Sequence, residues 1–424
     1  MFSPLIGQSD TFDNQLLLTA HTVTSAGSVL CLWFEHFYLT QQRALHQTIS
    51  STLVGVFAVT IGMTPNFLLL LFLSVFSPAN QSGLRTFHIT VKRMNQSEAR
   101  AACRTNYTDL VTVYRDEDNT LLTNMTSNDP AWIGLNRNQF SDKWSNGDDV
   151  TFNNLTAVCG SGSCCAAMKA DGSWESLKCT ENRTFMCYKQ DPDLTLKYHL
   201  ISENKSWYEA QSYCRKNYTD LVSIRDQNQN EAVRTEGLKS DTSFWIGLLL
   251  DDWEWTDGGR SAYRNWATSQ PRSPSDCTAL KREKEKWYSV PCSNIYPALC
   301  YSTLMHVSDD TMSWEDALGY CQDNGIGLLR IQSESDQKEV EFELRRRNVS
   351  GMLWVGLGQS QLFGFWMWTG GIGVGNWTNW AGGRQPEPPL SHHCGAIDTE
   401  KGFKWKDKDC RSKFRVLCEY KKKF

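Results

Sequence analysis

The chain lacks the features that mark nucleic-acid-binding or zinc proteins. It has 43 lysines and arginines against 47 aspartates and glutamates, for a formal net charge of −4, so it has no basic field for a polyphosphate. No two cysteines are spaced as Cys-x-x-Cys, and the 8 histidines do not flank the cysteines at zinc spacing. No set of nucleophile and base recurs along the chain. We therefore expect no nucleic-acid partner and no enzymatic activity.

Charge is also missing from one N-terminal stretch, since no Asp, Glu, Lys or Arg occurs between Ala44 and Leu84. Within it, "FLLLLFLSVF" is followed by Ser-Pro-Ala, which has the length of a signal-peptide core with a small-x-small cleavage site. Met63 lies just ahead of this core. If Met63 is the initiator, residues 63–79 are a signal peptide and residues 1–62 an uncertain N-terminal extension.

A second interpretation of the same stretch stays open. The uncharged segment from Thr52 to Phe76 is long enough to span a bilayer. Residues 63–79 would then belong to a signal anchor, and the chain would be a type II membrane protein with its domains outside. No other membrane attachment is expected. Both interpretations place the rest of the chain outside the cytosol, and secretion is the one we favour.

Cysteine is abundant, and fourteen of the 15 cysteines lie at or after Cys103. They belong to a block written three times, which opens at Cys103 in "CRTNYTDLVTV", at Cys214 in "CRKNYTDLVSI" and at Cys321 in "CQDNGIGLLRI". Each copy continues to "WIGL" or "WVGL" and closes on a cysteine after an apolar pair. The periods, 214−103 = 111 and 321−214 = 107, suit a small domain rather than a solenoid repeat.

The cysteines and the Asn-x-Ser/Thr sequons indicate the cellular compartment of the protein. Paired cysteines in compact repeats indicate an oxidising environment. Ten sequons support a secreted or cell-surface glycoprotein; they begin at Asn80, Asn95, Asn106, Asn124, Asn154, Asn182, Asn204, Asn217, Asn348 and Asn376. Cys31 is the odd cysteine, and it has no assigned partner.

Each repeat is predicted to be an α+β domain. An amphipathic segment precedes each first cysteine, and Ser206 with Glu209 has the spacing of a capping box, which Ser313 with Asp316 imitates. A second helix is clearest in "SESDQKEVEFELRRR" from Ser333. Short strands, glycine-rich turns and aromatic residues follow. The pattern predicts two helices and then short antiparallel sheets with a long loop region.

These residues resemble the C-type lectin-like domain. The likeness rests on four cysteines in this order, on "WIGL", and on a tryptophan between the two inner cysteines, such as Trp174 between Cys165 and Cys179 in the first copy. The array is similar to the tandem domains of mannose-receptor-like proteins. The resemblance implies three domains over residues 84–190, 195–301 and 302–420.

The resemblance also implies disulfides within each repeat. Taken by position, the pairs are Cys103–Cys187 with Cys165–Cys179, Cys214–Cys300 with Cys277–Cys292, and Cys321–Cys418 with Cys394–Cys410. The first copy has two further cysteines separated by "GSGS", and these favour a local pair, Cys159–Cys164.

Lectins of this family hold calcium in the long loop, through Glu-Pro-Asn or Gln-Pro-Asp, a Glu before the first inner cysteine, and Trp-Asn-Asp before the second; in the third copy these cysteines are Cys394 and Cys410. The third copy retains part of this pattern: Gln385 and Glu387 in "QPE", His392 in place of the Glu, and Asp407 in "WKD". Lys406 stands where an oxygen donor is expected, and an ammonium opposes a divalent cation unless it turns outward. The other interpretation is that these are polar loop residues around a cis-proline.

The first two copies cannot build the calcium site. The first has no proline between Ala131 and Gln190, and its tryptophan triplet is "WES". The second reads "QPR", with Arg272 at a ligand position, then Ser275 and "WYS". Calcium-dependent sugar binding is therefore expected only in the third repeat.

Two functions follow from the resemblance. The first is an extracellular recognition protein of C-type lectin type that binds glycans or glycoproteins through tandem domains. The second is a calcium-independent receptor or decoy that binds a protein ligand and has lost the sugar site.

The N-terminal alternatives lead to a direct prediction. Cleavage after Ala79 would give a mature chain that begins at Asn80, because the small residues at the end of the apolar core are those a signal peptidase accepts. N-terminal sequencing of the secreted protein checks this. A chain that retains residues 52–79 would establish the anchor instead.

Overall fold

The computed structural model describes residues 83–420, apart from residues 158, 160–161, 192–194, 325–326, 361–362, 376 and 388–391. The predicted signal or anchor segment, residues 1–62 with Cys31, and the sequon at Asn80 lie outside the described residues. Among the helices that are described, none is long and apolar enough to cross a membrane.

The third repeat folds into one domain from its own residues, with two helices and a sheet. Its elements are β13 (Met305–Val307), α8 (Trp314–Asn324), β14 (Gly327–Leu328), α9 (Glu334–Arg346), β15 (Met352–Gln359), β16 (Trp366–Trp368), β17 (Ile372–Gly373), β18 (His393–Asp398), β19 (Lys404–Asp409) and β20 (Arg415–Glu419). Strand β15 carries "WVGL" and is central. It pairs antiparallel with β16 and β18 and parallel with β20.

The predicted caps form. Ser333 accepts a hydrogen bond from the backbone N–H of Asp336 at the start of α9, and Ser313 accepts one from the N–H of Asp316 ahead of α8. The Ser206–Glu209 capping box is complete. The α+β prediction is confirmed, because local cap and periodicity signals decide where these helices begin.

The first repeat in sequence supplies two helices and six strands. These are β1 (Arg85–Ile89), α4 (Gln96–Asn106), β2 (Asp109–Leu110), α5 (Asp116–Met125), β3 (Ala131–Trp144), β4 (Cys164–Met168), β5 (Trp174–Lys178) and β6 (Arg183–Gln190). The second supplies β7 (Leu196–Lys205), α6 (Trp207–Asn217), β8 (Asp220–Leu221), α7 (Gln227–Gly237), β9 (Phe244–Trp255), β10 (Cys277–Lys281), the 3-10 turn η1 (Arg282–Lys284), β11 (Lys286–Val290) and β12 (Leu299–Thr303).

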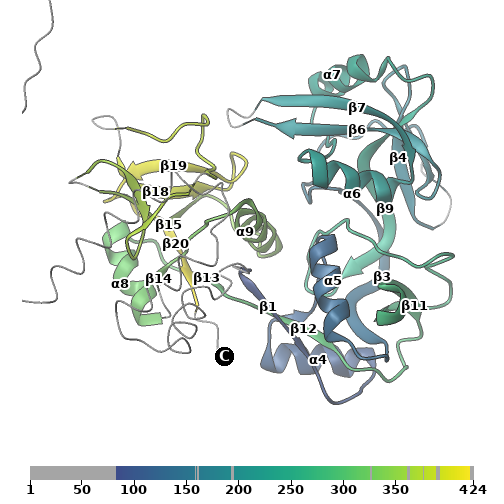
Figure 1. Ribbon diagram of the computed structural model, residues 1–424, viewed down its shortest axis with the longest axis horizontal. Coiled ribbons are helices and arrows are strands. Elements are labelled where there is room, and N and C mark those ends of the chain that lie inside the picture. The colour runs from purple at the N-terminus through teal and green to yellow at the C-terminus, as the bar shows by residue number, and fades with distance from the viewer. Residues whose placement is uncertain are drawn as a thin grey trace, which may run out of the picture. The chain divides into compact units, whose positions relative to one another are not determined.

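These two repeats exchange halves. The "WIGL" strand of repeat 1, β3, pairs with β10 of repeat 2. The "WIGL" strand of repeat 2, β9, pairs with β4 and β6 of repeat 1. In Figure 1 the purple helix α4 accordingly lies beside the green strand β12, although the two come from different repeats. Each of these pairings reproduces one that β15 makes inside repeat 3.

Two composite domains result. The first joins the helices of repeat 1 to the last strands of repeat 2, and its core brings Ile133 and Leu122 against Trp287 and Leu299. The second joins the last strands of repeat 1 to the helices of repeat 2, where Trp174 and Met186 pack with Val233 and Ile246. Strands β3 and β9 run antiparallel to each other and connect the two domains. The sequence repeats and the folded units therefore do not coincide.

The exchange corrects two predicted disulfides. Cys103 bonds to Cys300, not to Cys187, and Cys214 bonds to Cys187, not to Cys300. The reason is that the first and fourth cysteines meet across the same pair of elements in every domain, and here those elements belong to different repeats. The remaining pairs match the expectation: Cys159–Cys164, Cys165–Cys179, Cys277–Cys292, Cys321–Cys418 and Cys394–Cys410.

A turn explains why repeat 3 does not exchange. Its β15–β16 pairing ends at Gln359 and Trp366, which leaves six residues for the connection, including Gly364 at φ 75°. The same register would leave four residues in repeat 1, residues 138–141, and only residues 251–252 in repeat 2. Neither connection contains a glycine, and tight hairpin turns favour Asn-Gly or Gly at positions of positive φ, so both segments extend into long strands instead.

The glycine of the "WIGL" or "WVGL" motif has the same role in all three copies, because a side chain there would strike backbone. A Cβ at Gly356 would lie 2.9 Å from the carbonyl oxygen of Leu328, and one at Gly247 would lie 2.9 Å from that of Val222. A Cβ at Gly134 would lie 3.1 Å from that of Leu110. This close approach lets the central strand donate its N–H to the neighbouring segment, as Gly356 does to Leu329 at 2.8 Å.

We predict that Gly356→Ala destabilises the third repeat by roughly 1–3 kcal/mol, as overpacking against a rigid backbone does. Gly319→Ala is the matched control, because Gly319 lies on helix α8 with nothing within 4 Å of a new Cβ. Helix propensity makes that change neutral or stabilising by up to about 1 kcal/mol. Calorimetric melting of both variants measures the difference, and equal melting temperatures would contradict the packing argument.

Candidate ligand-binding loop of the third repeat

Two of the predicted site residues lie in the loop ahead of β18. Gln385 and Glu387 are both exposed to solvent. Between them, the carbonyl oxygen of Pro386 accepts a hydrogen bond from the indole N–H of Trp366 at 2.8 Å. Trp366 is buried on β16. The loop is thus attached to the sheet through its backbone, and its polar side chains remain free to face a ligand.

Asp407 lies on β19, opposite Gly395 of β18. One oxygen of its carboxylate accepts the backbone N–H of His392 at 3.0 Å. The His392 side chain is exposed. The structure therefore brings Asp407 and His392 together, but through a backbone hydrogen bond that fixes the start of β18 rather than through two side chains that share a ligand.

Lys406 lies on the opposite face of β19 from Asp407, because successive side chains of a strand alternate. Its ammonium is 2.8 Å from a carboxylate oxygen of Asp398. Burial opposes the ionisation of Asp398, but the hydrogen bond and charge of Lys406 outweigh it and hold the pKa of Asp398 below its ordinary value. The lysine thus turns away from the loop, where it neither repels a cation nor supplies an oxygen.

These residues do not fit a complete calcium cage. Calcium takes six to eight oxygen ligands, whereas the loop offers one amide and two carboxylates, and one carboxylate already accepts an N–H. No group of three or more His, Cys, Asp or Glu side chains able to hold a metal occurs among the residues that the structure describes.

The loops differ in their proline geometry from what the second interpretation assumed. Among the described peptide bonds, those in cis are Gln270–Pro271 and Ser273–Pro274 of repeat 2, and Gln385–Pro386 is not one of them. In repeat 2 the hydroxyl of Ser289 donates to the Gln270 amide oxygen at 2.8 Å and accepts the N–H of Arg272 at 2.7 Å. Gln270 and Arg272, which stand at ligand positions of the family pattern, are thus both hydrogen-bonded to Ser289.

Most sequons present an exposed asparagine. Those with exposed side chains are Asn106, Asn124, Asn182, Asn204, Asn217 and Asn348. Two others are partly buried and engaged: Asn95 caps helix α4, and the amide of Asn154 donates to the carbonyl of Gly172 at 2.9 Å. Asn376, like Asn80, lies outside the described residues.

Comparison with known proteins agrees with this architecture. The profile of the lectin C-type domain matches residues 92–189, 203–302 and 310–420, which is most of the chain. The chain belongs to the C-type lectin domain family. The matched ranges follow the sequence repeats, so the exchange of halves described above is a property of the folded chain that the profile does not contain.

The family members that are similar to this chain include receptors. The human secretory phospholipase A2 receptor is 25% identical over 370 residues, covering 68% of this chain and 24% of that protein. Human lymphocyte antigen 75 is 25% identical over 51% of this chain and 14% of its own length. Rat L-selectin is 32% identical over 31% of this chain and 39% of its own. The chain thus spans a minor part of these relatives.

Among solved structures, human lithostathine is 25% identical and is covered over 91% of its length, with 28% of this chain and a TM-score of 0.26. The mouse scavenger receptor C-type lectin carbohydrate-recognition domain is 24% identical, with 28% of this chain, 89% of that chain and a TM-score of 0.24.

Two features of the structure, one in this loop and one in the fold of repeats 1 and 2, were not predicted from the sequence. One is the bond from Trp366 to the Pro386 carbonyl, for which the sequence carries no signal. The other is the exchange of halves, for which a signal exists. No glycine occurs between Gly134 and Gly147 or between Gly247 and Gly258, where each hairpin would have to turn.

We predict that Asp407→Ala lowers the stability of the third repeat by about 1 kcal/mol even in EDTA, because the His392 N–H loses its acceptor. Glu387→Ala should leave stability unchanged, since Glu387 is exposed. Melting of the two variants in EDTA checks this. If Asp407→Ala melts like the unsubstituted protein, Asp407 has no structural part in the calcium-free loop.

Proposed function

We propose that the chain is an extracellular recognition protein that binds carbohydrate or glycoprotein ligands through its tandem domains. The support is the family membership over three repeats, the disulfide-bonded cores and the exposed sequons. Several sites on one chain add avidity even when each is weak. This is a non-catalytic role outside the cytosol, with secretion favoured and an N-terminal anchor as the alternative.

Calcium-dependent sugar binding is the first mode, and it is confined to repeat 3. Gln385 and Glu387 carry exposed oxygens in one loop, and Asp407 lies near the start of β18. A glycan contacting this loop would meet the side chains of Gln385, Glu387 and His392. Loss of the loop carboxylate would therefore weaken a sugar complex directly.

Calcium-independent binding of a protein ligand is the second mode, for a receptor or decoy that has lost the sugar site. One observation favours it: the oxygen donors of repeat 3 are too few for calcium, and one carboxylate is committed to the His392 N–H. In repeat 2 the equivalent side chains are paired with each other. The lectin scaffold is kept in all three copies while the metal loop is not.

An array experiment separates the two modes. Purified residues 80–424 are applied to mannose and galactose arrays, with calcium and with EDTA. The first mode predicts binding that EDTA removes and that Glu387→Ala weakens at least tenfold. Glu283→Ala, an exposed residue in the turn η1 of repeat 2, is the matched control and should not change binding. Binding that ignores both EDTA and Glu387→Ala excludes the first mode.

A further inference from the structure

The strands that connect the two composite domains carry opposite net charges. Strand β3 of repeat 1 carries Arg137 and Lys143 beside one acid, Asp142, and strand β9 of repeat 2 carries Asp251, Asp252 and Glu254. In the third repeat, the charge-free stretch from Asn348 to Gly383 includes the equivalent strands and the turn between them. The repeats that exchange halves are therefore those whose central strands are charged.

These charges meet across the exchange. Arg137 forms an ion pair with Asp252, and its guanidinium lies 4.9 Å above the ring of Trp253. The amide of Asn138 donates to Glu254 at 2.6 Å. Each contact joins repeat 1 to repeat 2, and none could form if each repeat closed its own hairpin.

The strongest contact is buried. The ammonium of Lys143 lies 2.7 Å from one oxygen of Asp251, and the guanidinium of Arg264 lies 2.8 Å from the other. Asp251 and Arg264 have 0% of their side chains exposed. Burial works against the ionisation of Asp251, but the two cations outweigh it and hold its pKa below the ordinary value. A charge buried this deeply needs its partners, since an unpaired one would be strongly destabilising.

The unexchanged alternative would lose the pairs that cross between repeats, such as Lys143 with Asp251, while Arg264 and Asp251 both belong to repeat 2. On the register of repeat 3, a hairpin closed within repeat 2 would use Asp251 and Asp252 as its two turn residues, with Glu254 opposite Leu249. The three acids would then lie within one hairpin that contains no Lys or Arg, and Asp252 and Glu254 would lose their partners Arg137 and Asn138.

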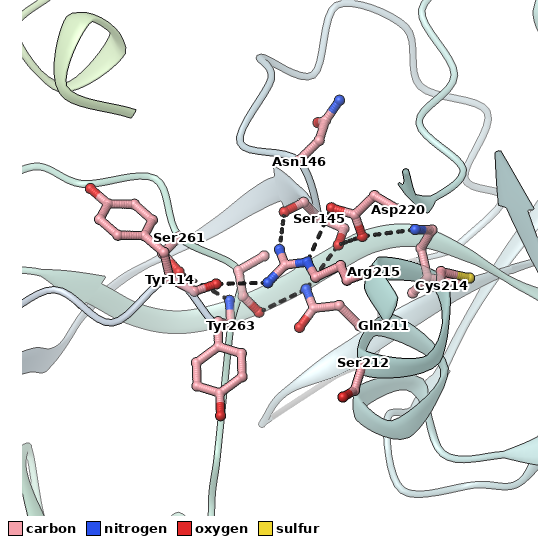
Figure 2. Close-up of polar contacts among 12 residues, drawn as sticks. Tyr114, Ser145, Asn146, Gln211, Ser212, Cys214, Arg215, Asp220, Ser261 and Tyr263 are labelled. Atoms are coloured by element: carbon pink, nitrogen blue, oxygen red, sulfur yellow. Dashed lines mark hydrogen bonds and ion pairs between the residues drawn. The ribbon is translucent and has the colours of Figure 1, made fainter. Parts of the chain in front are cut away.

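A second cluster ties the same junction together (Figure 2). Arg215 of α6 forms an ion pair with Asp220 at 3.2 Å and donates to two carbonyls of repeat 1, those of Ser145 and Tyr114, both at 2.7 Å. The hydroxyl of Ser145 donates to Asp220. The reciprocal contact exists in the first composite domain, where Asp109 pairs with Arg104 and accepts the hydroxyl of Thr256.

We propose that the charged strands β3 and β9 form a recognition surface through which repeats 1 and 2 select each other during folding. The partner that fits Arg137 and Lys143 of β3 is an acidic strand of a second lectin-type repeat. The first and fourth cysteines then fix the selection. Each disulfide forms as two thiols pass two electrons and two protons to an external disulfide, which becomes two thiols.

The bonded pairs cannot readily revert once formed. Cys103, Cys187, Cys214 and Cys300 are all 0% exposed, so an attacking thiolate has no access to the sulfurs without unfolding. Repeats 1 and 2 therefore act as one covalent unit. In it, the long loop of each repeat is presented on the helices of the other, so a substitution in one repeat alters a binding face composed of both.

The test is a disulfide map of the full secreted chain. Trypsin under non-reducing conditions gives peptides 101–104 with Cys103, 184–189 with Cys187 and 206–215 with Cys214. The proposal predicts a link between 184–189 and 206–215 by mass spectrometry. A link between 101–104 and 184–189 in the unsubstituted protein would overturn it, as would a covalent dimer that carries the Cys187–Cys214 bond between two chains.

Charge reversal tests the selection itself. Asp252→Lys with Glu254→Lys should lower the yield of the 184–189 to 206–215 link at least fivefold, because the first lysine would face the cation of Arg137 and the second would remove the carboxylate that accepts the Asn138 amide. Adding Arg137→Glu should restore it. Asp241→Lys is the control and should change nothing, because Asp241 is an exposed acid that lies outside β9, three residues ahead of its start.

If the double variant is not secreted, recovery of secretion and of the exchanged link by the triple variant supports the proposal, and failure to recover overturns it. An unchanged link in a secreted double variant also overturns it.

Discussion

Each lectin-type domain of this chain depends on one strand arrangement. The strand that begins with Trp-Ile-Gly-Leu or Trp-Val-Gly-Leu must lie between the strand of the inner disulfide and the strand of the last cysteine. In repeat 3 these are β15, β18 and β20 of one repeat. In the other two domains the same arrangement is completed by strands of the neighbouring repeat. The sheet requires this pairing of strands, and either repeat can supply the partner strand.

Because either repeat can supply the strand, two similar repeats form composite domains whose cores are complete. The buried tryptophans keep their roles: Trp174 packs beside Trp144 and donates its indole N–H to Asn230 of repeat 2, and Trp287 donates to Asn119 of repeat 1. The equivalent Trp405 donates to Gln337 of its own repeat. The three domains make the same kinds of contact. They differ only in whether the two residues come from one repeat or from two.

The candidate binding loop of repeat 3 keeps the contacts of the scaffold but has few oxygen ligands. Its scaffold contacts are intact, as in the Trp366 bond to the Pro386 carbonyl, while its ligand oxygens are reduced in number. Asp407 retains the residue type of the family pattern, but its carboxylate organises the backbone of His392. A retained residue type is therefore compatible with a structural role, and this is why binding and stability must be measured separately for Asp407 and Glu387.

The number of domains, their α+β class, the helix starts and five of the seven disulfides were predictable from the sequence, because caps, periodicity and cysteine order act locally or within one repeat. The helix expected from Ser333 and the capping box at Ser206 are examples. Which repeat completes which domain is seen only in the folded chain. Cys103 could meet Cys187 or Cys300 with equal local justification, since both end the same kind of strand. We attribute the choice to the short connections without glycine that the two repeats would need, residues 138–141 and 251–252, and to the buried ion pair of Lys143 with Asp251, which are 108 positions apart.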